Sequence, residues 1–170
     1  MKYLIKIVLP LLGMITLPLS AVANDFTCPS LDDLKHFNGG GYAAFRLNDL
    51  GLDEKYAENE WIVAKSKFTH TNIDVLITGV KLSENDTYPF DAIENSLSKL
   101  KLVEPYEASS FDGMAYNLCT YNTTGYAESD DDDISLNSAY FVHFEFSSED
   151  NILEKSASLT AIQSIIKNRR

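Results

Sequence analysis

The sequence has few basic residues, few cysteines and no long apolar run beyond its first twenty residues. Only 14 lysines and arginines stand against 25 aspartates and glutamates, so the formal net charge is −11. A surface this negative repels phosphate backbones and anionic lipids, which excludes nucleic-acid binding and peripheral membrane attachment. Because no later segment has the length of a transmembrane helix, we expect no membrane insertion of the mature chain.

What the sequence does contain begins with the three parts of a secretory signal. Met1–Lys6 is a short basic start, Ile7–Leu19 is an almost wholly apolar run, and the small residues Ala21 and Ala23 precede a cleavage point before Asn24. The apolar run is short and contains prolines, which disfavours the alternative of a membrane anchor. A signal peptide over residues 1–23 leaves a mature chain of one domain, 24–170, and predicts a periplasmic or secreted protein.

Cys28 and Cys119 are the only cysteines, and an exported chain meets an oxidising compartment. The sequence therefore predicts one structural disulfide between them. A bridge over so long a loop stabilises the folded chain by roughly 4–5 kcal/mol when only chain entropy is considered. Two free thiols or a redox pair are the alternatives, although a redox pair is usually spaced Cys-x-x-Cys.

The hydrophobic patterns predict a single α+β domain. Ser30 is expected to cap the first helix, and Gly39–Gly41 to end it because glycine tolerates positive φ. The polar stretch Thr69–Asn72 between two strands predicts an antiparallel hairpin. The expected helices cover residues 31–37, 89–102 and a segment after Ser147 or Ser148, and the expected strands cover 42–47, 61–68, 73–82, 114–121 and 140–146. We expect an antiparallel sheet of four to five strands, with the helices packed on one face.

No pattern of metal or haem ligands stands out, so the sequence predicts no cofactor. The consecutive acids of Glu128–Asp133 lack the staggered spacing and the glycine of a calcium loop, and a solvated hairpin tip explains them. His36, His70 and His143 lie in different elements and belong to no Cys-x-x-Cys-His or His-Glu-x-x-His motif. Weak calcium or magnesium binding by the acidic loop, and non-covalent haem binding through histidine or tyrosine, stay open as alternatives.

No enzyme signature is present either, and we expect a non-catalytic protein. There is no Gly-x-Ser-x-Gly motif, and Gly39–Gly41 lacks the Lys-Ser/Thr that follows the glycines of a phosphate-binding loop. Ser96–Lys99 has Ser-x-x-Lys spacing but lacks the Ser-Asp-Asn and Lys-Thr-Gly elements that accompany it in penicillin-binding proteins.

Three residues are candidates for a partner-binding surface: Trp61, Phe141 and His143. Trp61 opens a strand beside acidic neighbours and is either part of the core or an aromatic anchor for a partner. In the last strand the even-numbered apolar residues are expected to face the core, so that Phe141 and His143 face outward or lie under a helix. An aromatic row exposed at that position indicates an association surface.

Several short features of the chain resemble one family of periplasmic proteins. They are the signal peptide, Cys28-Pro29-Ser30 near the mature start, a single tryptophan that opens a central strand, and a late strand with Cys119-Thr120-Tyr121. In these the chain resembles the EirA-type periplasmic proteins of intracellular gammaproteobacteria, which are associated with the Dot/Icm type IVB secretion system. Some relatives carry a haemin-binding label. The resemblance implies an accessory protein that supports effector export, with no catalytic residues to carry over.

Two function hypotheses follow. The first is a non-catalytic periplasmic interaction protein, whose partners are other envelope proteins, including secretion-system components, or a second copy of the chain. The second is a carrier protein that binds a small ligand, of which haem is the leading candidate, or a metal ion.

Overall fold

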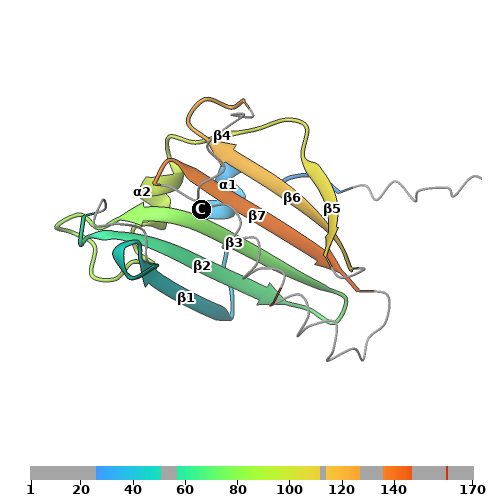
Figure 1. The fold of residues 1–170 in the computed structure, drawn as a ribbon, viewed down its shortest axis with the longest axis horizontal. Coiled ribbons are helices and arrows are strands. Elements are labelled where there is room, and N and C mark those ends of the chain that lie inside the picture. Colours follow the sequence, from blue (N-terminus) through green and yellow to red (C-terminus); the bar gives the residue numbers. More distant parts are fainter. Residues whose placement is uncertain (1–25, 51–56, 112–113, 127–135, 147–159, 161–170) are drawn as a thin grey trace, which may run out of the picture.

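A computed structural model describes residues 26–50, 57–111, 114–126, 136–146 and 160 (Figure 1). These residues form one antiparallel sheet of seven strands in the order β1-β2-β3-β7-β6-β4, and β5 also pairs with β6. The strands are β1 (Gly41–Arg46), β2 (Glu60–Phe68), β3 (Asn72–Lys81), β4 (Lys101–Leu102), β5 (Glu107–Phe111), β6 (Met114–Asn122) and β7 (Ser138–Glu145). The described helices are α1 (Leu31–Lys35), α2 (Ile93–Leu97) and a short 3-10 helix, η1 (Asn48–Leu50).

Strands β3 and β7 lie in the middle of the sheet and are apolar on both sides. β3 is buried from Val75 to Val80, and β7 from Ser138 to Val142. Across the two strands, Leu76 lies opposite Phe141. A pair of this kind contributes about 0.2–1 kcal/mol to the stability of a sheet. Strands with this composition are stable only where both faces of the sheet are covered.

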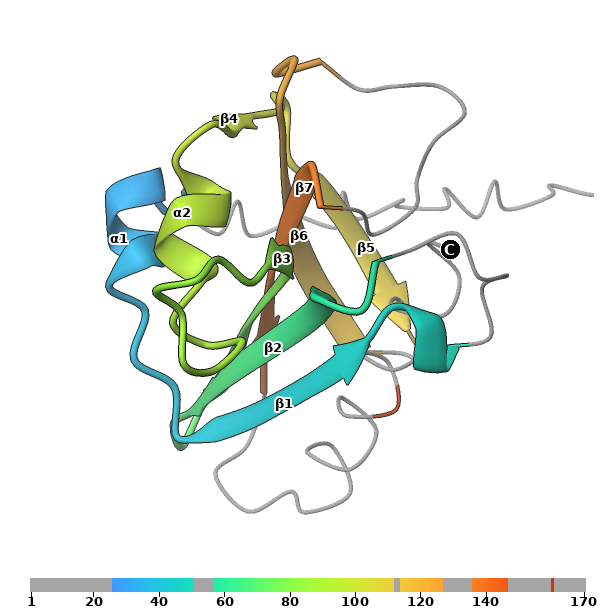
Figure 2. The same cartoon turned by 90° about the vertical axis from the view of Figure 1, so that its left-hand side faces the viewer.

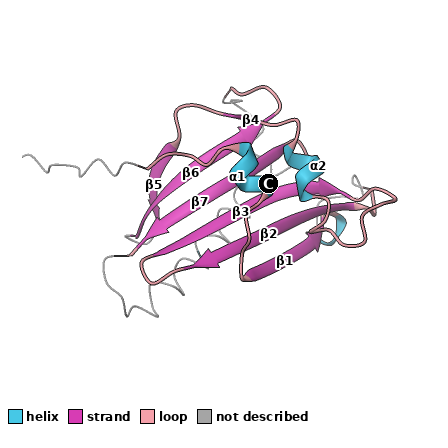
Figure 3. Cartoon of the chain, turned by 180° about the vertical axis from the view of Figure 1, so that it is seen from behind, coloured by secondary structure: helices cyan, strands magenta, loops and turns pink. Residues whose placement is uncertain are grey.

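Each face of the sheet carries its own hydrophobic cluster, because successive side chains of a strand point to opposite faces. Helices α1 and α2 lie on the same face, which we call the helix-bearing face (Figure 2, Figure 3). Its buried cluster comprises Leu34, Val63, Leu76, Val80, Ala92, Ile93, Leu97, Leu100, Cys119, Tyr121, Ala139 and Phe141. The cluster of the opposite face comprises Leu47, Ile62, Ile73, Val75, Ile77, Leu118, Tyr140, Val142 and Phe144.

Helix α1 begins at the serine that the sequence indicates. The Ser30 hydroxyl accepts a hydrogen bond from the Asp33 backbone N–H (3.2 Å), and the Asp33 carboxylate accepts one from the Ser30 backbone N–H (3.1 Å). This reciprocal pair satisfies two backbone donors at the start of the helix. The bonds from Ser30 also hold the pKa of the Asp33 carboxyl below its usual value.

The structure confirms the antiparallel sheet but corrects the predicted α+β class, because the described chain is mostly sheet. The expected number of four to five strands is wrong, and α1 and α2 have five residues each. The apolar spacing over residues 89–102 does mark one buried side, since Ile93, Leu97 and Leu100 all lie in the helix-bearing cluster. The helix nevertheless ends at Leu97, and β4 begins at Lys101. β4 has only two residues and β5 is largely polar, so neither shows the alternation that predicts a strand.

Other predictions are confirmed or lie outside the described residues. β2 and β3 form the expected hairpin, with Phe68 paired to Ile73. The signal peptide, the acidic loop over 128–133 and the last helix, apart from Thr160, fall on residues that the structure does not describe. Within the described ranges, no helix is long and apolar enough to cross a membrane.

The glycine run Gly39–Gly41 has a role different from the expected one. Among the described glycines only Gly125 has a positive φ, so the run does not use that freedom. Instead, Gly39 is buried where the chain approaches β2, and a Cβ atom there would lie 2.6 Å from the Ser66 carbonyl oxygen. Glycine is therefore the only residue type that fits at position 39 without moving the backbone of β2.

We expect Gly39→Ala to lower the free energy of unfolding by about 1–3 kcal/mol, as is usual for overpacking against fixed atoms. Gly40→Ala is the matched control, because no atom lies within 4 Å of a Cβ at that position. It should change stability by less than about 0.5 kcal/mol. Urea unfolding followed by the fluorescence of the single tryptophan measures both variants. Equal effects at the two positions would contradict the packing argument.

Candidate functional site

The predicted disulfide is present and fixes the N-terminal segment of the described chain on β6. Cys28 and Cys119 are bonded, with their Cα atoms 5.8 Å apart and a sequence separation of 91. Close by, the Tyr121 hydroxyl donates a hydrogen bond of 2.7 Å to the Pro29 carbonyl oxygen. Both contacts start from the helix-bearing face of β6, so residues 26–29 are held against that face.

Phe26 extends this segment toward β7. Its ring stacks on the His143 imidazole, with centroids 5.1 Å apart and an interplanar angle of 25°. On another side it meets the ring of Tyr106 edge-on at 5.3 Å. Phe26 thus links the histidine of β7 to the loop that precedes β5.

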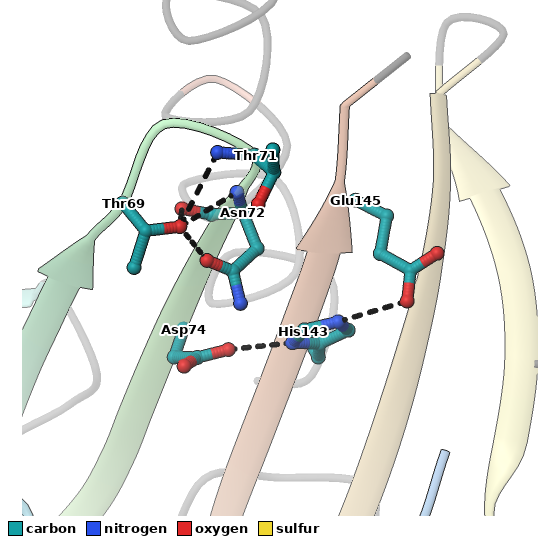
Figure 4. A network of polar contacts seen from close by, with 6 residues as sticks. All are labelled: Thr69, Thr71, Asn72, Asp74, His143 and Glu145. Atoms are coloured by element: carbon teal, nitrogen blue, oxygen red, sulfur yellow. Dashed lines mark hydrogen bonds and ion pairs between the residues drawn. The ribbon is translucent and has the colours of Figure 1, made fainter. Parts of the chain in front are cut away.

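His143 lies between two carboxylates (Figure 4). Its Nδ1 atom is 2.6 Å from Asp74 Oδ1 on β3, and its Nε2 atom is 3.3 Å from Glu145 Oε1 on the same strand. Asp74 and His143 are direct cross-strand partners, which explains why the shorter contact forms. The hydrogen bond to Asp74 raises the pKa of His143 above its usual value, against the opposing effect of burial. The imidazolium form is therefore favoured in this cluster.

This arrangement limits the chemistry of His143. Both ring nitrogens already contact a carboxylate, so neither presents a lone pair to a metal ion or to haem. In Figure 4 the tight turn beside the cluster is held by Thr69, whose hydroxyl accepts hydrogen bonds from the backbone N–H groups of Thr71 and Asn72. The cluster joins β3 to β7, and Phe26 covers it.

The raised pKa of His143 gives a prediction for stability against pH. A histidine whose pKa is higher in the folded state contributes stability that is complete below the unfolded value, near pH 6.5, and is lost as the pH rises through the folded pKa. We expect the urea midpoint of the wild-type chain to fall over that interval. His143→Gln should lose this fall, whereas His70→Gln, at an exposed turn position, should keep it. A wild-type midpoint that rises with pH across the interval would show the sign to be wrong.

A cavity of about 490 Å³, open to solvent on one side, lies between the N-terminal segment and the chain from the end of β4 to the start of β5. Its volume is within the range of small-molecule sites. The lining is mainly apolar and includes one cysteine of the disulfide: Phe26, Thr27, Cys28, Leu102, Glu104, Pro105 and Tyr106. The sequence could not indicate this cavity, because its walls come from two segments that are far apart along the chain, 26–28 and 102–106.

The other two candidate partner-binding residues lie in or against the core. Phe141 is only 5% exposed and its ring meets that of Phe37, two residues after α1, edge-on at 5.9 Å, so it is covered and is not an exposed anchor. Trp61 is partly buried against the helix-bearing cluster. The Arg46 guanidinium lies over its ring, 5.2 Å from the centroid. Of the two interpretations of Trp61, the structure favours the core one.

Three exposed aromatic side chains lie together at one edge of the sheet, whereas Tyr88, Tyr106 and Tyr126 are exposed in loops. Tyr42 and Phe45 on β1 and Phe68 on β2 have relative exposures of 55%, 46% and 46%. β1 is the terminal strand, and among the described residues no strand pairs with its outer side. The sequence indicates the strand over 42–47, but it does not show which strand is at an edge. We call Tyr42, Phe45, Arg46 and Phe68 the β1 edge surface.

The remaining histidines are not brought together with His143. His36 ends α1, where its Nδ1 atom is 2.8 Å from the Asp32 carbonyl oxygen, and His70 is exposed in the β2–β3 turn. The part of the chain that the structure describes contains no cluster of three or more histidine, cysteine, aspartate or glutamate side chains suited to a metal ion.

The fold and site define a disulfide-linked antiparallel sheet protein with one open aromatic edge. Comparison of the chain with known protein families, with functionally characterised proteins and with solved structures gives no match.

Proposed function

We propose that this chain is a non-catalytic periplasmic protein that binds other envelope proteins, as an accessory of a type IV secretion system that supports effector export. The observation that carries the proposal is the β1 edge surface, because exposed aromatic side chains on a rigid edge are typical of protein-binding sites. The disulfide between Cys28 and Cys119 supports an oxidising compartment. The secretion-system role is supported only by the resemblance to the EirA-type proteins.

Recovery of partners from envelope extract after mild crosslinking tests this function. The wild-type chain should recover secretion-apparatus components, and Phe45→Asp should recover less of them because it places a charge in the aromatic surface. Tyr126→Asp is the matched control, since Tyr126 is 77% exposed and lies away from β1, after β6. Recovery of no envelope protein by the wild-type chain would count against the function.

The cavity beside Cys28 supports a second candidate function, which is a carrier of a small, largely apolar ligand. Haem is the first ligand to test. Tyr106 is the residue of the cavity lining that could ligate haem iron, since His143 has both ring nitrogens engaged and does not line the cavity. Titration with haemin should then give a saturable Soret shift that Tyr106→Phe abolishes. No shift, or a shift that survives the substitution, excludes this role for Tyr106.

A further inference from the structure

We infer that the outer edge of β1 accepts an extended, acidic segment of a partner protein, which joins the sheet as a further strand. This inference rests on the proposed function, and it specifies how the partner binds and what chemistry the partner has. Addition of a strand to a sheet edge is a recurrent mode of peptide recognition, in which backbone hydrogen bonds give affinity and alternate side chains give specificity.

The backbone of β1 is suited to such pairing. β1 has six residues, and on its outer side alternate N–H and C=O groups face away from β2. Edge strands are usually protected by proline, by several charges or by short length. β1 contains no proline, and Arg46 is its one charged residue.

The other edge of the sheet has the protection that β1 lacks. There the edge is divided between β4, which has two residues, and β5, which carries Glu107 and two serines. Pro105, which has no backbone N–H, lies between the two strands. The contrast between the two edges favours β1 as the position at which a strand is added.

The charge of the β1 edge selects an acidic partner. On the helix-bearing face of β1 and β2 the charged side chains are Arg46, Lys65 and Lys67, all basic, in a chain of net charge −11. Glu60 of β2 lies on the opposite face and pairs with Lys81, and the other acids near them lie outside β1 and β2. Asp91 interacts electrostatically with Lys65. Asp74 lies on β3 opposite Lys67 of β2, and it is hydrogen-bonded to His143.

Arg46 is the side chain placed to contact the added strand. Its guanidinium is held over the Trp61 ring at 5.2 Å, and stacking of this kind leaves the N–H edge of the guanidinium available to a carboxylate. A strand paired with β1 would lie about 4.8 Å away, so its side chain opposite Arg46 is within reach. Lys65 and Lys67 are one strand further and act at longer range.

The opposite face of the same edge sets the alternate positions of the partner. Phe45 and Phe68 are both 46% exposed there, and they can cover apolar side chains of the added strand. The segment that fits therefore alternates acidic residues, on the helix-bearing face, with apolar residues on the opposite face.

The test uses a fluorescein-labelled decapeptide of alternating glutamate and valine, with an alternating lysine and valine peptide as control probe. The oxidised mature chain should bind the glutamate probe saturably in fluorescence anisotropy, at least about ten-fold more tightly than the lysine probe, and less tightly as salt rises. Binding should slow hydrogen exchange of the amides of Gly41–Arg46.

Charge reversal at one position separates this site from general attraction. Arg46→Glu should weaken binding of the glutamate probe about ten-fold, because it removes a bidentate partner and adds a repulsive charge. Lys101→Glu makes the same change of charge on an exposed side chain of β4, at the far edge, and should leave binding unchanged. Thermal unfolding checks that both variants fold.

The outcomes distinguish this inference from the proposed function. Equal binding of the two probes would overturn the inference, and so would slowed hydrogen exchange at amides outside β1. A dimer whose β1 amides are protected without any probe would also overturn it, because a second copy then occupies the edge. If envelope partners are recovered equally by the wild-type and Arg46→Glu chains, strand addition fails while the function stands. If the glutamate probe binds at β1 but no envelope protein is recovered, the function fails while the strand site stands.

Discussion

Phe144→Ala is expected to lower the free energy of unfolding by about 3–5 kcal/mol, which is the usual cost of deleting a fully buried aromatic side chain. Phe144 is 0% exposed on the central strand β7. It lies opposite Ile73 on β3 and opposite Tyr116 on β6, whose ring is 5.4 Å away. Since both neighbouring strands are fixed by their own pairing, the sheet cannot collapse to fill the space that the ring leaves.

Phe68→Ala is the control for this substitution, because it deletes the same side chain from the same face at an exposed position. Phe68 keeps 46% of its surface in contact with solvent, so the loss should be about 1 kcal/mol. Urea midpoints with an unchanged slope measure both variants. Similar losses of unfolding free energy for the two variants would contradict the argument that burial at Phe144 causes the larger effect.

The parts of the fold that the sequence predicts are those that depend on short-range patterns. The turn between Phe68 and Ile73 and the helix cap at Ser30 involve residues that are close along the chain. The alternation of β7 also places Tyr140, Val142 and Phe144 correctly in one cluster. The same pattern leaves Phe141 undecided, because an apolar residue on the second side of a strand is buried only if another element covers it.

The parts that the sequence misses depend on register and on the order of strands. Asp74 and His143 are 69 residues apart and meet only because β3 pairs with β7 in one particular register. The exposure of the β1 edge surface likewise follows from the position of β1 at the end of the sheet order. Trp61 lies against the core, and its ring also carries the Arg46 guanidinium of the neighbouring strand, a contact that depends on the register of β1 and β2.

Removal of the disulfide is the second large effect that we expect. The double variant Cys28→Ala/Cys119→Ala should lose about 2–5 kcal/mol of unfolding free energy. Without the bond, the unfolded chain is no longer closed into a loop across a separation of 91 residues, so its conformational entropy is higher. The folded state also loses an anchor, since the segment that carries Phe26 and the Pro29 carbonyl would be held on β6 mainly by the Tyr121 hydroxyl. Chemical denaturation with and without a reductant measures the change.

The same experiment tests the argument for export. Reductant should destabilise the wild-type chain by about as much as the double substitution does, and it should have no effect on the double variant. The chain obtained from cells should resist alkylation of Cys28 and Cys119 until it is reduced. If both thiols react at once in that chain, and the reductant changes nothing, then the bond does not form where the protein works. The oxidising compartment would then lose its structural support, and the periplasmic partners proposed for the β1 edge surface would lose it too, because both depend on a chain that folds outside the cytosol.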